Sequence, residues 1–221
     1  MRVGAGDGAR ADRKPGDMVA ADESLALVER PRYVSRGGDK LAAALDAFGV
    51  DPRGMICLDV GASTGGFTDC LLQHGAARVY ALDVGRGQLA ESLRNDPRVV
   101  LLERTHAARL APDHPQPVTL PEPIELAVID VSFISLTRVL AAVDSQLDRG
   151  GTLIALVKPQ FEVEPNLAPG GVVRELQARQ AAVESVEDHA RSIGLRVLGR
   201  LESPLVGPAG NREYLVHLVP S

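Results

Sequence analysis

The amino-acid sequence predicts an α/β fold with a mostly parallel seven-stranded sheet and helices on both of its faces. From residue 56 onward, short apolar runs alternate with segments of helical periodicity. Continuous apolar strands of this kind are typical of parallel sheets that are buried on both faces. The last two apolar runs are joined only by a Pro- and Gly-rich loop, residues 203–211, which is too short for a helical crossover. We therefore expect the last strand to run antiparallel.

The individual elements follow from the spacing of apolar residues along the chain. A helix over residues 40–48 places its apolar side chains on one face and ends at Gly49. A brief strand is expected at 24–28, and the sheet strands at 56–60, 78–84, 98–102, 126–131, 152–157, 195–201 and 214–219. The later helices are expected near 67–74, 88–94, 136–147 and 174–193.

The composition limits the class of protein and of partner. A chain of 221 residues is long enough for one large domain that needs no disulfide or metal to stabilise it. No apolar run approaches the roughly 18–20 residues that cross a bilayer, and no signal peptide opens the sequence. We therefore expect a cytoplasmic protein that does not associate with a membrane. Cys57, Cys70 and the five histidines lack metal-ligand spacing, which predicts buried thiols and no metal site. The formal net charge of −5 disfavours nonspecific nucleic-acid binding.

A glycine-rich turn, DVGASTGGF over residues 59–67, follows the first sheet strand. Ligands of doubly wound sheets bind at the carboxyl ends of the strands. Ser63 stands where a dinucleotide fingerprint needs glycine, which disfavours a nicotinamide-dependent oxidoreductase. The turn is closer to one that holds S-adenosylmethionine, with Asp59 facing the cationic ligand and the glycines admitting its amino-acid part. Asp83 ends the next strand and is expected to accept hydrogen bonds from both ribose hydroxyls; the alternative is a purely structural turn.

Lysine is scarce in this chain, because only Lys14, Lys40 and Lys158 stand among 24 basic residues. Each remaining lysine is therefore a candidate for chemistry that arginine cannot perform. Asp130 and Lys158 end the fourth and fifth sheet strands, Glu213 begins the reversed last strand, and Lys40 lies in the first helix. We expect these last four side chains at the edge of the sheet that carries the glycine-rich turn.

Two lysines and two carboxylates at one edge suit methyl transfer to a weakly acidic hydroxyl. A second cation and partial desolvation lower the pKa of a lysine in general, whereas an arginine does not usefully lose its proton. We interpret Lys158 as the general base. Asp130 would orient it and face the sulfonium, and Lys40 and Glu213 would position the ribose and tune the base. The alternative is that all four are ordinary charges at strand ends.

Five sequence blocks, in unbroken order from Tyr33 to the C-terminus, together resemble the TlyA family. They are YVSRGGDKL (33–41), DVGASTGGFT (59–68), DVSFISL (130–136), VKPQFE (157–162) and GNREY (210–214). This family, often labelled hemolysin A, belongs with the FtsJ-like ribosomal RNA 2′-O-methyltransferases. The resemblance implies the Rossmann-like fold of class I methyltransferases, S-adenosylmethionine as the methyl donor and a cytidine ribose in ribosomal RNA as the acceptor. It also implies a catalytic tetrad of Lys40, Asp130, Lys158 and Glu213.

The sequence also predicts the residues that bind the cofactor and the RNA. The cofactor residues are expected to be Asp59, Gly61, Ala62, Ser63, Gly65, Gly66, Phe67, Asp83, His106 and Asp130. His106 stands where relatives often carry Asn and is the residue expected to contact the adenine. Arg32, Arg36 and Lys40 are expected to contact RNA, since they lie with Arg30 in a basic segment offset only by Asp39. An ordinary charged linker is the alternative for this segment.

The resemblance divides the chain into residues 1–32 and residues 33–221. We expect residues 1–32 to be a linker and the trailing half of an S4-type RNA-binding domain, with Lys14 as part of its surface, and residues 33–221 to be the methyltransferase domain. Relatives normally carry a complete S4-type domain, so either the start site is misplaced, or the chain is shortened, or RNA recognition depends on the catalytic domain or on a partner. Two other functions are alternatives for this chain: an S-adenosylmethionine-binding protein without RNA activity, and a membrane-active hemolysin. The absence of an apolar span and of an amphipathic basic helix disfavours the hemolysin.

Overall fold

The computed structural model describes residues 2–3, 25–26, 31–207 and 209–221 of the chain. The chain forms two compact units, Met1–Arg32 and Tyr33–Ser221. In the first unit, strands β1 (Arg2–Val3) and β2 (Leu25–Ala26) pair antiparallel. The predicted S4-like remnant, with Lys14 and Arg30, otherwise lies outside the described residues.

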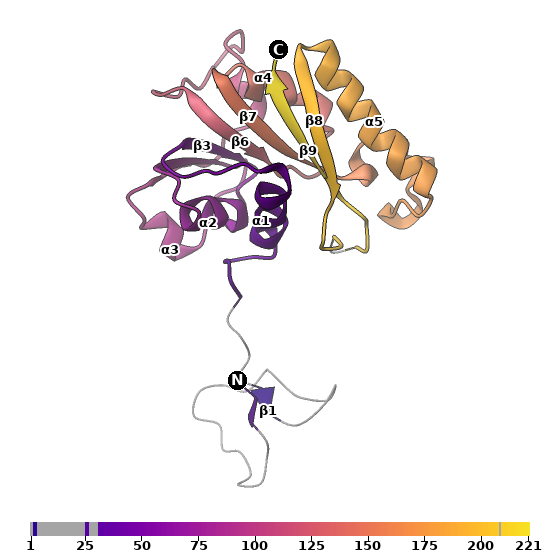
Figure 1. Ribbon diagram of the computed structural model, residues 1–221, viewed down its shortest axis with the longest axis horizontal. Helices are drawn as coiled ribbons and strands as arrows, with labels where there is room; N and C mark the ends of the chain where they lie inside the picture. The colour runs from indigo at the N-terminus through magenta and orange to yellow at the C-terminus, as the bar shows by residue number, and fades with distance from the viewer. Residues whose placement is uncertain (1, 4–24, 27–30, 208) are drawn as a thin grey trace. The chain divides into compact units, whose positions relative to one another are not determined.

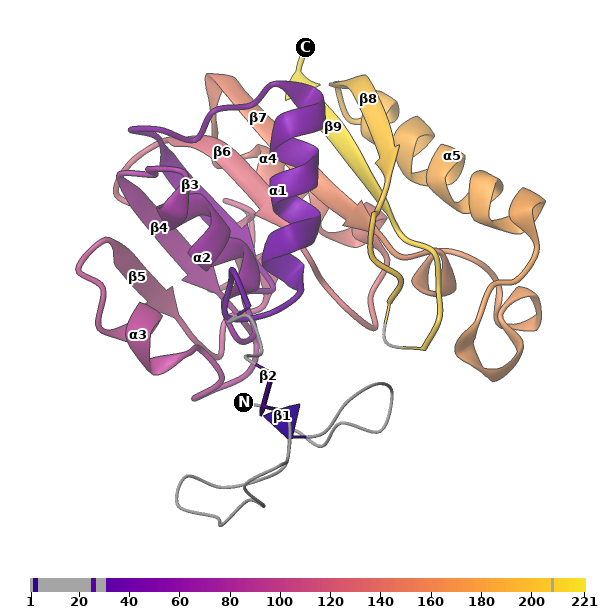
Figure 2. The ribbon, with the colours of Figure 1, turned by 60° about the horizontal axis from the view of Figure 1, so that its bottom comes forward.

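The second unit is built on a seven-stranded sheet in the order β5-β4-β3-β6-β7-β9-β8 (Figures 1 and 2). The strands are β3 (Ile56–Val60), β4 (Arg78–Leu82), β5 (Val99–Leu102), β6 (Ile124–Ile129), β7 (Leu147–Val157), β8 (Leu195–Glu202) and β9 (Tyr214–Pro220). Strands β3 to β7 pair in parallel, whereas β9 pairs antiparallel with both β7 and β8. The predicted mostly parallel sheet with a reversed last strand is therefore confirmed.

Helices cover both faces of this sheet (Figure 2). Helices α1 (Gly37–Phe48) and α2 (Gly66–Gln73) pack on one face, and α4 (Leu140–Asp144) and α5 (Leu176–Ser192) pack on the other. The short helices are α3 (Glu91–Arg94), η2 (Ala107–Leu110), η3 (Leu136–Arg138), η4 (Pro159–Phe161), η5 (Pro165–Leu167) and η6 (Pro169–Gly171). Helix α1 ends as predicted at Gly49, which adopts a left-handed conformation with φ of 66°.

The side chains of β3 alternate between two cores, one on each face of the sheet. Leu58 and Val60 belong to the core under α4 and α5, and Cys57 belongs to the core under α1 and α2. Both cysteines are free and buried, as predicted. Burial raises the pKa of the Cys57 thiol to about 12, with a smaller contribution from nearby carboxylates. The raised pKa keeps this thiol protonated, and the thiolate is the reactive form of cysteine. Cys57 therefore serves to pack the core.

Two predicted helices differ from the structure. The helix expected over residues 136–147 is present as η3 and α4 but ends at Asp144, and the strand expected from residue 152 already begins at Leu147. Leu147 pairs with Ile124 of β6, and this pairing outweighs the helical periodicity of the local sequence. The helix expected over residues 88–94 is reduced to the single turn α3.

Candidate active site

Three turns meet at the carboxyl edge of the parallel strands. Gly61 follows β3 with φ of 89°, and a Cβ atom there would lie 2.5 Å from the carbonyl oxygen of Asp130, which follows β6. Only glycine allows this close approach. The turn is tied to β4 as well, because the N–H groups of Gly61 and Ala62 both donate to the Leu82 carbonyl, at 2.8 and 3.1 Å. The glycine-rich turn is thus fixed against both neighbouring strands.

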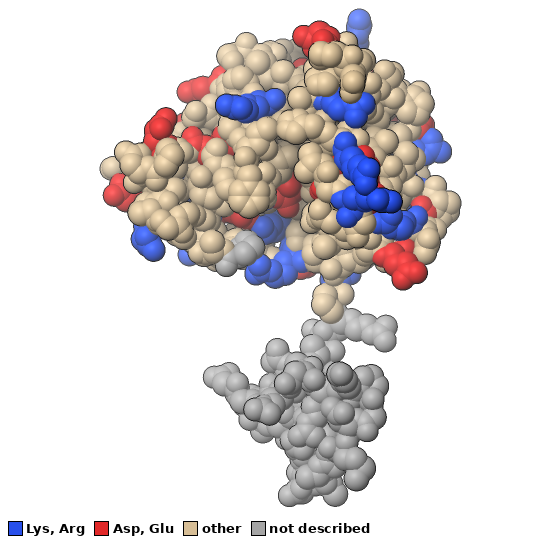
Figure 3. Space-filling view, turned by 180° about the vertical axis from the view of Figure 1, so that it is seen from behind, with Lys and Arg blue, Asp and Glu red and all other residues tan. Residues whose placement is uncertain are grey.

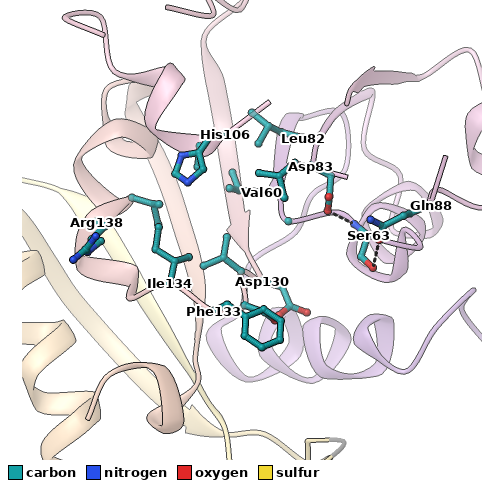
Figure 4. A pocket seen from close by; sticks show the side chains of 16 residues that line it. Val60, Ser63, Leu82, Asp83, Gln88, His106, Asp130, Phe133, Ile134 and Arg138 are labelled. Carbon is teal, nitrogen blue, oxygen red and sulfur yellow. Dashed lines mark hydrogen bonds between the residues drawn. The ribbon is translucent and has the colours of Figure 1, made fainter. Parts of the chain in front are cut away.

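Two adjoining cavities open beside these turns. The larger, of about 580 Å³, is lined by side chains from the ends of β3, β4 and β6 and from the loops that follow them (Figure 4). The smaller, of about 260 Å³, is lined by residues of the first turn of α1, the glycine-rich turn and the end of β7. Gly61, Ser63, Asp130 and Ser132 line both cavities, so one continuous cleft has two compartments.

In the larger cavity, Asp83 is held by the backbone on both of its oxygens. Its Oδ2 accepts a hydrogen bond from the Ser63 N–H at 2.8 Å, and its Oδ1 accepts one from the Gly85 N–H at 2.6 Å. The Ser63 hydroxyl lies 3.4 Å from Gln88 Oε1 on the same wall (Figure 4). A carboxylate has about four lone-pair directions, so Asp83 has further capacity for hydroxyl donors.

In the smaller cavity, Lys158 is held by two groups from the loop after β6. Its Nζ lies 2.6 Å from Asp130 Oδ1 and donates a hydrogen bond to Ser132 Oγ at 2.8 Å. The lysine side chain is only 11% exposed, whereas that of Asp130 is 23% exposed. The lysine is therefore held in one place while its carboxylate partner still faces the cleft.

The second lysine of the predicted tetrad is paired with its second carboxylate. Lys40 of α1 forms an ion pair with Glu213, which directly precedes β9, and both side chains are buried. Gly207 leaves room for this carboxylate, since a Cβ atom there would lie 2.6 Å from Glu213 Oε1. Asn211 holds the same loop, because its side chain bonds to the backbone of Val173 and of Gly171. Lys40 lines the smaller cavity and Glu213 does not.

Eight of the ten predicted cofactor residues line one or both cavities: Gly61, Ala62, Ser63, Gly66, Phe67, Asp83, His106 and Asp130. Gly65 does not, because its α-carbon faces the side chains of Leu93 and Leu89, and a Cβ atom there would lie 2.3 Å from Leu93. Gly65 instead begins α2 in a left-handed conformation.

Asp59 also lies outside both cavities, contrary to the expectation that its carboxylate faces the ligand. The alternation along β3 turns this side chain under α2, where it is fully buried and accepts a hydrogen bond from the Thr68 hydroxyl at 2.6 Å. Burial raises the pKa of Asp59 to about 7, and the nearby charges of Asp130 and Asp83 add to this rise, while the Thr68 hydrogen bond opposes it. Its action on the cleft is therefore indirect.

The structure adds several lining residues that the sequence analysis did not single out: Ser35, Thr64, Val84, Gln88, Ser132, Phe133, Ile134 and Arg138. Phe133 is the most unusual, since it is 91% exposed and has a positive φ of 64°. No sequence pattern indicates that Phe133 lines the cleft, because its exposure beside Asp130 depends on the conformation of the loop.

Basic groups occur at the cleft despite the negative net charge. Arg36 is exposed and lines the smaller cavity together with Lys40 and Lys158. Arg32 is exposed and belongs to the first unit. On the face shown in Figure 3, Lys and Arg side chains gather in one larger group and along the lower edge, with Asp and Glu side chains beside them. Groups of basic side chains thus occur on this face although the net charge of the chain is negative.

The comparison with known proteins shows the family of the chain. The model of the FtsJ-like methyltransferase family matches residues 33–219. The chain belongs to this family. It is 48% identical over 208 residues to "16S/23S rRNA (cytidine-2′-O)-methyltransferase TlyA" of Mycobacterium tuberculosis, covering 93% of this chain and 76% of the relative. It is 41% identical over 198 residues to "Hemolysin A" of Brachyspira hyodysenteriae, covering 89% of this chain and 81% of that one.

Solved structures place this FtsJ-like chain in the class I methyltransferase fold. A Lactococcus lactis protein described as a hemolysin has a TM-score of 0.82 at 43% identity, over 87% of this chain and 90% of the other. The magnesium protoporphyrin IX methyltransferase of Synechocystis has a TM-score of 0.55 at 15% identity, over 83% and 81% of the two chains, and shows the fold alone. The fold predicted from the sequence is thereby confirmed.

Proposed function

We propose that this protein transfers the methyl group of S-adenosylmethionine to the 2′-hydroxyl of a ribose, that of a cytidine in ribosomal RNA. One observation carries the proposal: two lysine–carboxylate pairs lie at the carboxyl edge of an FtsJ-like sheet, and three of their four side chains line the compartment beside the glycine-rich turn. The choice of cytidine and of ribosomal RNA is supported by the name of the Mycobacterium tuberculosis relative.

The larger cavity fits S-adenosylmethionine. Its volume of about 580 Å³ is within the range of about 300–1,000 Å³ that is typical of small-molecule sites. Asp83 is placed to accept ribose hydroxyls, Leu82 and Val84 offer an apolar wall for a base, and Asp130 offers a negative charge to a cationic ligand. When bound, S-adenosylmethionine supplies an electrophilic methyl group to the attacking oxygen.

In this mechanism, Lys158 takes the proton of the 2′-hydroxyl as the oxygen attacks. Asp130 and Ser132 hold Nζ in one position, which reduces the entropic cost of reaching the reactive arrangement. Lys40 adds a second positive charge to the wall of the same compartment and so stabilises negative charge that develops on the oxygen. Glu213 keeps Lys40 in place from behind the cavity wall.

Arg36, Lys40 and Arg32 are proposed to contact the RNA. Arg36 and Lys40 line the acceptor compartment, where phosphate groups beside the target ribose would meet positive charge. Within the residues that the structure describes, no helix combines the length and apolarity needed to cross a bilayer, and no three His, Cys, Asp or Glu side chains are arranged to hold a metal ion. We propose the cytoplasm as the location of the protein, since its proposed substrate is found there.

The test is calorimetric titration with S-adenosylmethionine, followed by methylation of isolated small and large ribosomal subunits. We expect the wild type to bind the donor and to methylate at least one subunit, and Lys158→Ala to bind the donor without methylating. Donor binding without methylation of either subunit would favour the alternative of a binding protein. Leakage of liposomes at low protein concentration would favour the membrane-active alternative.

A further inference from the structure

Two loops form the acceptor side of the cleft, and the Glu162 carboxylate, which lines neither of the two cavities, joins them by two hydrogen bonds. The first loop is residues 130–136, which follows β6, and the second is residues 158–162, which follows β7. We propose that Glu162 is a positioning residue that holds the first loop against the second and thereby keeps Asp130 and Ser132 on Lys158. The predicted loss of catalysis rests on the proposed function, whereas the contact between the two loops does not.

The Glu162 carboxylate holds the start of η3 with both oxygens. Oε2 accepts a hydrogen bond from the Ser135 hydroxyl at 2.6 Å, and Oε1 accepts one from the Leu136 N–H at 2.9 Å. Ser135 is itself the N-cap of η3, because its hydroxyl accepts from the Thr137 N–H at 3.2 Å. Burial raises the pKa of Glu162, whereas the hydrogen bonds from Ser135 and Leu136 and the nearby His189 oppose this rise. These donors compensate a carboxylate that has been partly withdrawn from water.

The second loop transmits this anchoring to Lys158 because it is short and internally bonded. The Phe161 N–H donates to the Lys158 carbonyl at 2.9 Å, and the Glu162 N–H donates to the Pro159 carbonyl at 3.0 Å. Pro159 further restricts the backbone directly after the lysine. Lys158 and Glu162 are thus the two ends of one tight turn, so the position of one constrains the other.

The first loop needs such an external hold. Phe133 has a positive φ of 64°, a conformation that costs free energy for a residue other than glycine and persists only where neighbouring contacts maintain it. Its ring is 91% exposed and meets the ring of Phe161 at a centroid distance of 5.2 Å. Residues 158–162 therefore contact the first loop at three points: Lys158 on Asp130 and Ser132, Phe161 on Phe133, and Glu162 on Ser135 and Leu136.

Of these three contacts, only that of Glu162 lies away from the cleft. Glu162 lines neither cavity, so it has no direct contact with a substrate there. Replacing Glu162 changes none of the reacting groups, but it removes a contact that holds the first loop, on which Asp130 and Ser132 lie. A small misplacement of aligned groups lowers a rate by up to about a hundredfold.

The test compares Glu162→Ala, Glu162→Gln and the control Glu164→Ala, which removes an exposed carboxylate two residues further along. We expect Glu162→Ala to lower kcat about tenfold to a hundredfold, with KM for S-adenosylmethionine within about twofold of the wild type. Glutamine can accept from the Leu136 N–H and still bond to Ser135, so Glu162→Gln should restore most of kcat. Ser135→Ala, which removes one of the two donors, should give an intermediate loss and serves if Glu162→Ala does not fold.

A second readout needs no activity. The chain contains no tryptophan, so Phe133→Trp places a single tryptophan, whose emission can be excited selectively over that of the three tyrosines, on the first loop. We expect its fluorescence anisotropy to fall when Glu162→Ala is added, and to stay unchanged with Glu162→Gln or Glu164→Ala. Unchanged anisotropy in the folded Glu162→Ala background, or a loss of kcat that matches only the loss of folded protein, would overturn the proposal. If anisotropy falls but the wild type methylates nothing, the loop contact stands and the proposed function is wrong.

Discussion

The two lysine–carboxylate pairs of the cleft differ in how far they are withdrawn from water. In the pair of Lys40 and Glu213, the side chains are 10% and 2% exposed, and the two residues lie 173 positions apart. In the pair of Lys158 and Asp130, they are 11% and 23% exposed, and the carboxylate lines both cavities. The sealed pair joins α1 to the residue before the last strand and exposes only Lys40 to the smaller cavity, whereas in the open pair both the lysine and the carboxylate line that cavity. We therefore expect the first pair to contribute to stability and the second to contribute mainly to catalysis.

The largest expected effect comes from replacing Lys158. Lys158→Arg keeps the positive charge but does not usefully lose a proton, so we expect the methylation rate to fall about 10²–10⁴-fold, close to that of Lys158→Ala. The thermal midpoint of both variants should remain close to that of the wild type. Initial rates on ribosomal subunits and thermal unfolding measure the two quantities. Activity retained in Lys158→Arg would mean that the lysine acts only through its charge.

The sealed pair should respond in the opposite way. Glu213→Ala leaves the Lys40 ammonium buried without its partner, and we expect a loss of about 3–5 kcal/mol in the free energy of unfolding. Glu202→Ala is the matched control, because it breaks the exposed ion pair between Glu202, the last residue of β8, and Arg212, which directly precedes Glu213, and about 0–1 kcal/mol is expected there. Urea unfolding of both variants gives the comparison. Equal losses would show that burial does not distinguish the pairs.

Asp59 extends the comparison to a buried carboxylate that forms none of the ion pairs found in the described part of the chain. The pKa of Asp59 is about 7 in the folded protein, above its value of about 4 in the unfolded chain. Between these two pH values, the folded protein therefore holds a proton on Asp59 that the unfolded chain has lost. The contribution of Asp59 to stability is therefore present at pH below about 4 and is lost as the pH rises to about 7. Asparagine does not titrate, so as the pH rises across this window the free energy of unfolding of Asp59→Asn should increase by about 1 kcal/mol or more relative to that of the wild type. Unfolding curves of the two proteins that stay parallel from pH 4 to 8 would contradict the assignment.

The smallest expected effect concerns the rim of the acceptor compartment. Arg36 is exposed, and if it meets a phosphate, Arg36→Ala should weaken RNA binding several-fold and reduce the salt slope of the affinity by about 1. Filter binding to ribosomal RNA fragments at several salt concentrations measures this slope. An unchanged slope would remove Arg36 from the RNA-binding surface and leave Lys40 and the open pair as the charged groups of that compartment.

The sheet and the ends of its strands were largely predictable, because continuous apolar runs bounded by glycine and charged residues have few other interpretations. Strand β3 has the predicted bounds, and Asp83, Asp130 and Lys158 follow their strands directly. The end of the helix expected over residues 136–147 was wrong, since the helix stops at Asp144 and the start of β7 depends on its pairing with Ile124. No local pattern contains that information.

The sequence by itself determined the order of strands and helices along the chain and the chemical composition of the site: the glycine-rich turn, and two lysines with two carboxylates at one edge. Only the tertiary structure decided which charge is sealed, which is open and which is hidden. The alternation of β3 turned Asp59 away from the cleft, the loop before β9 buried Glu213, and Glu162 contacted a loop 27 positions away. The physical reason is that the environment of a charge depends on packing between distant segments, whereas the periodicity of a strand or helix is already present in neighbouring residues.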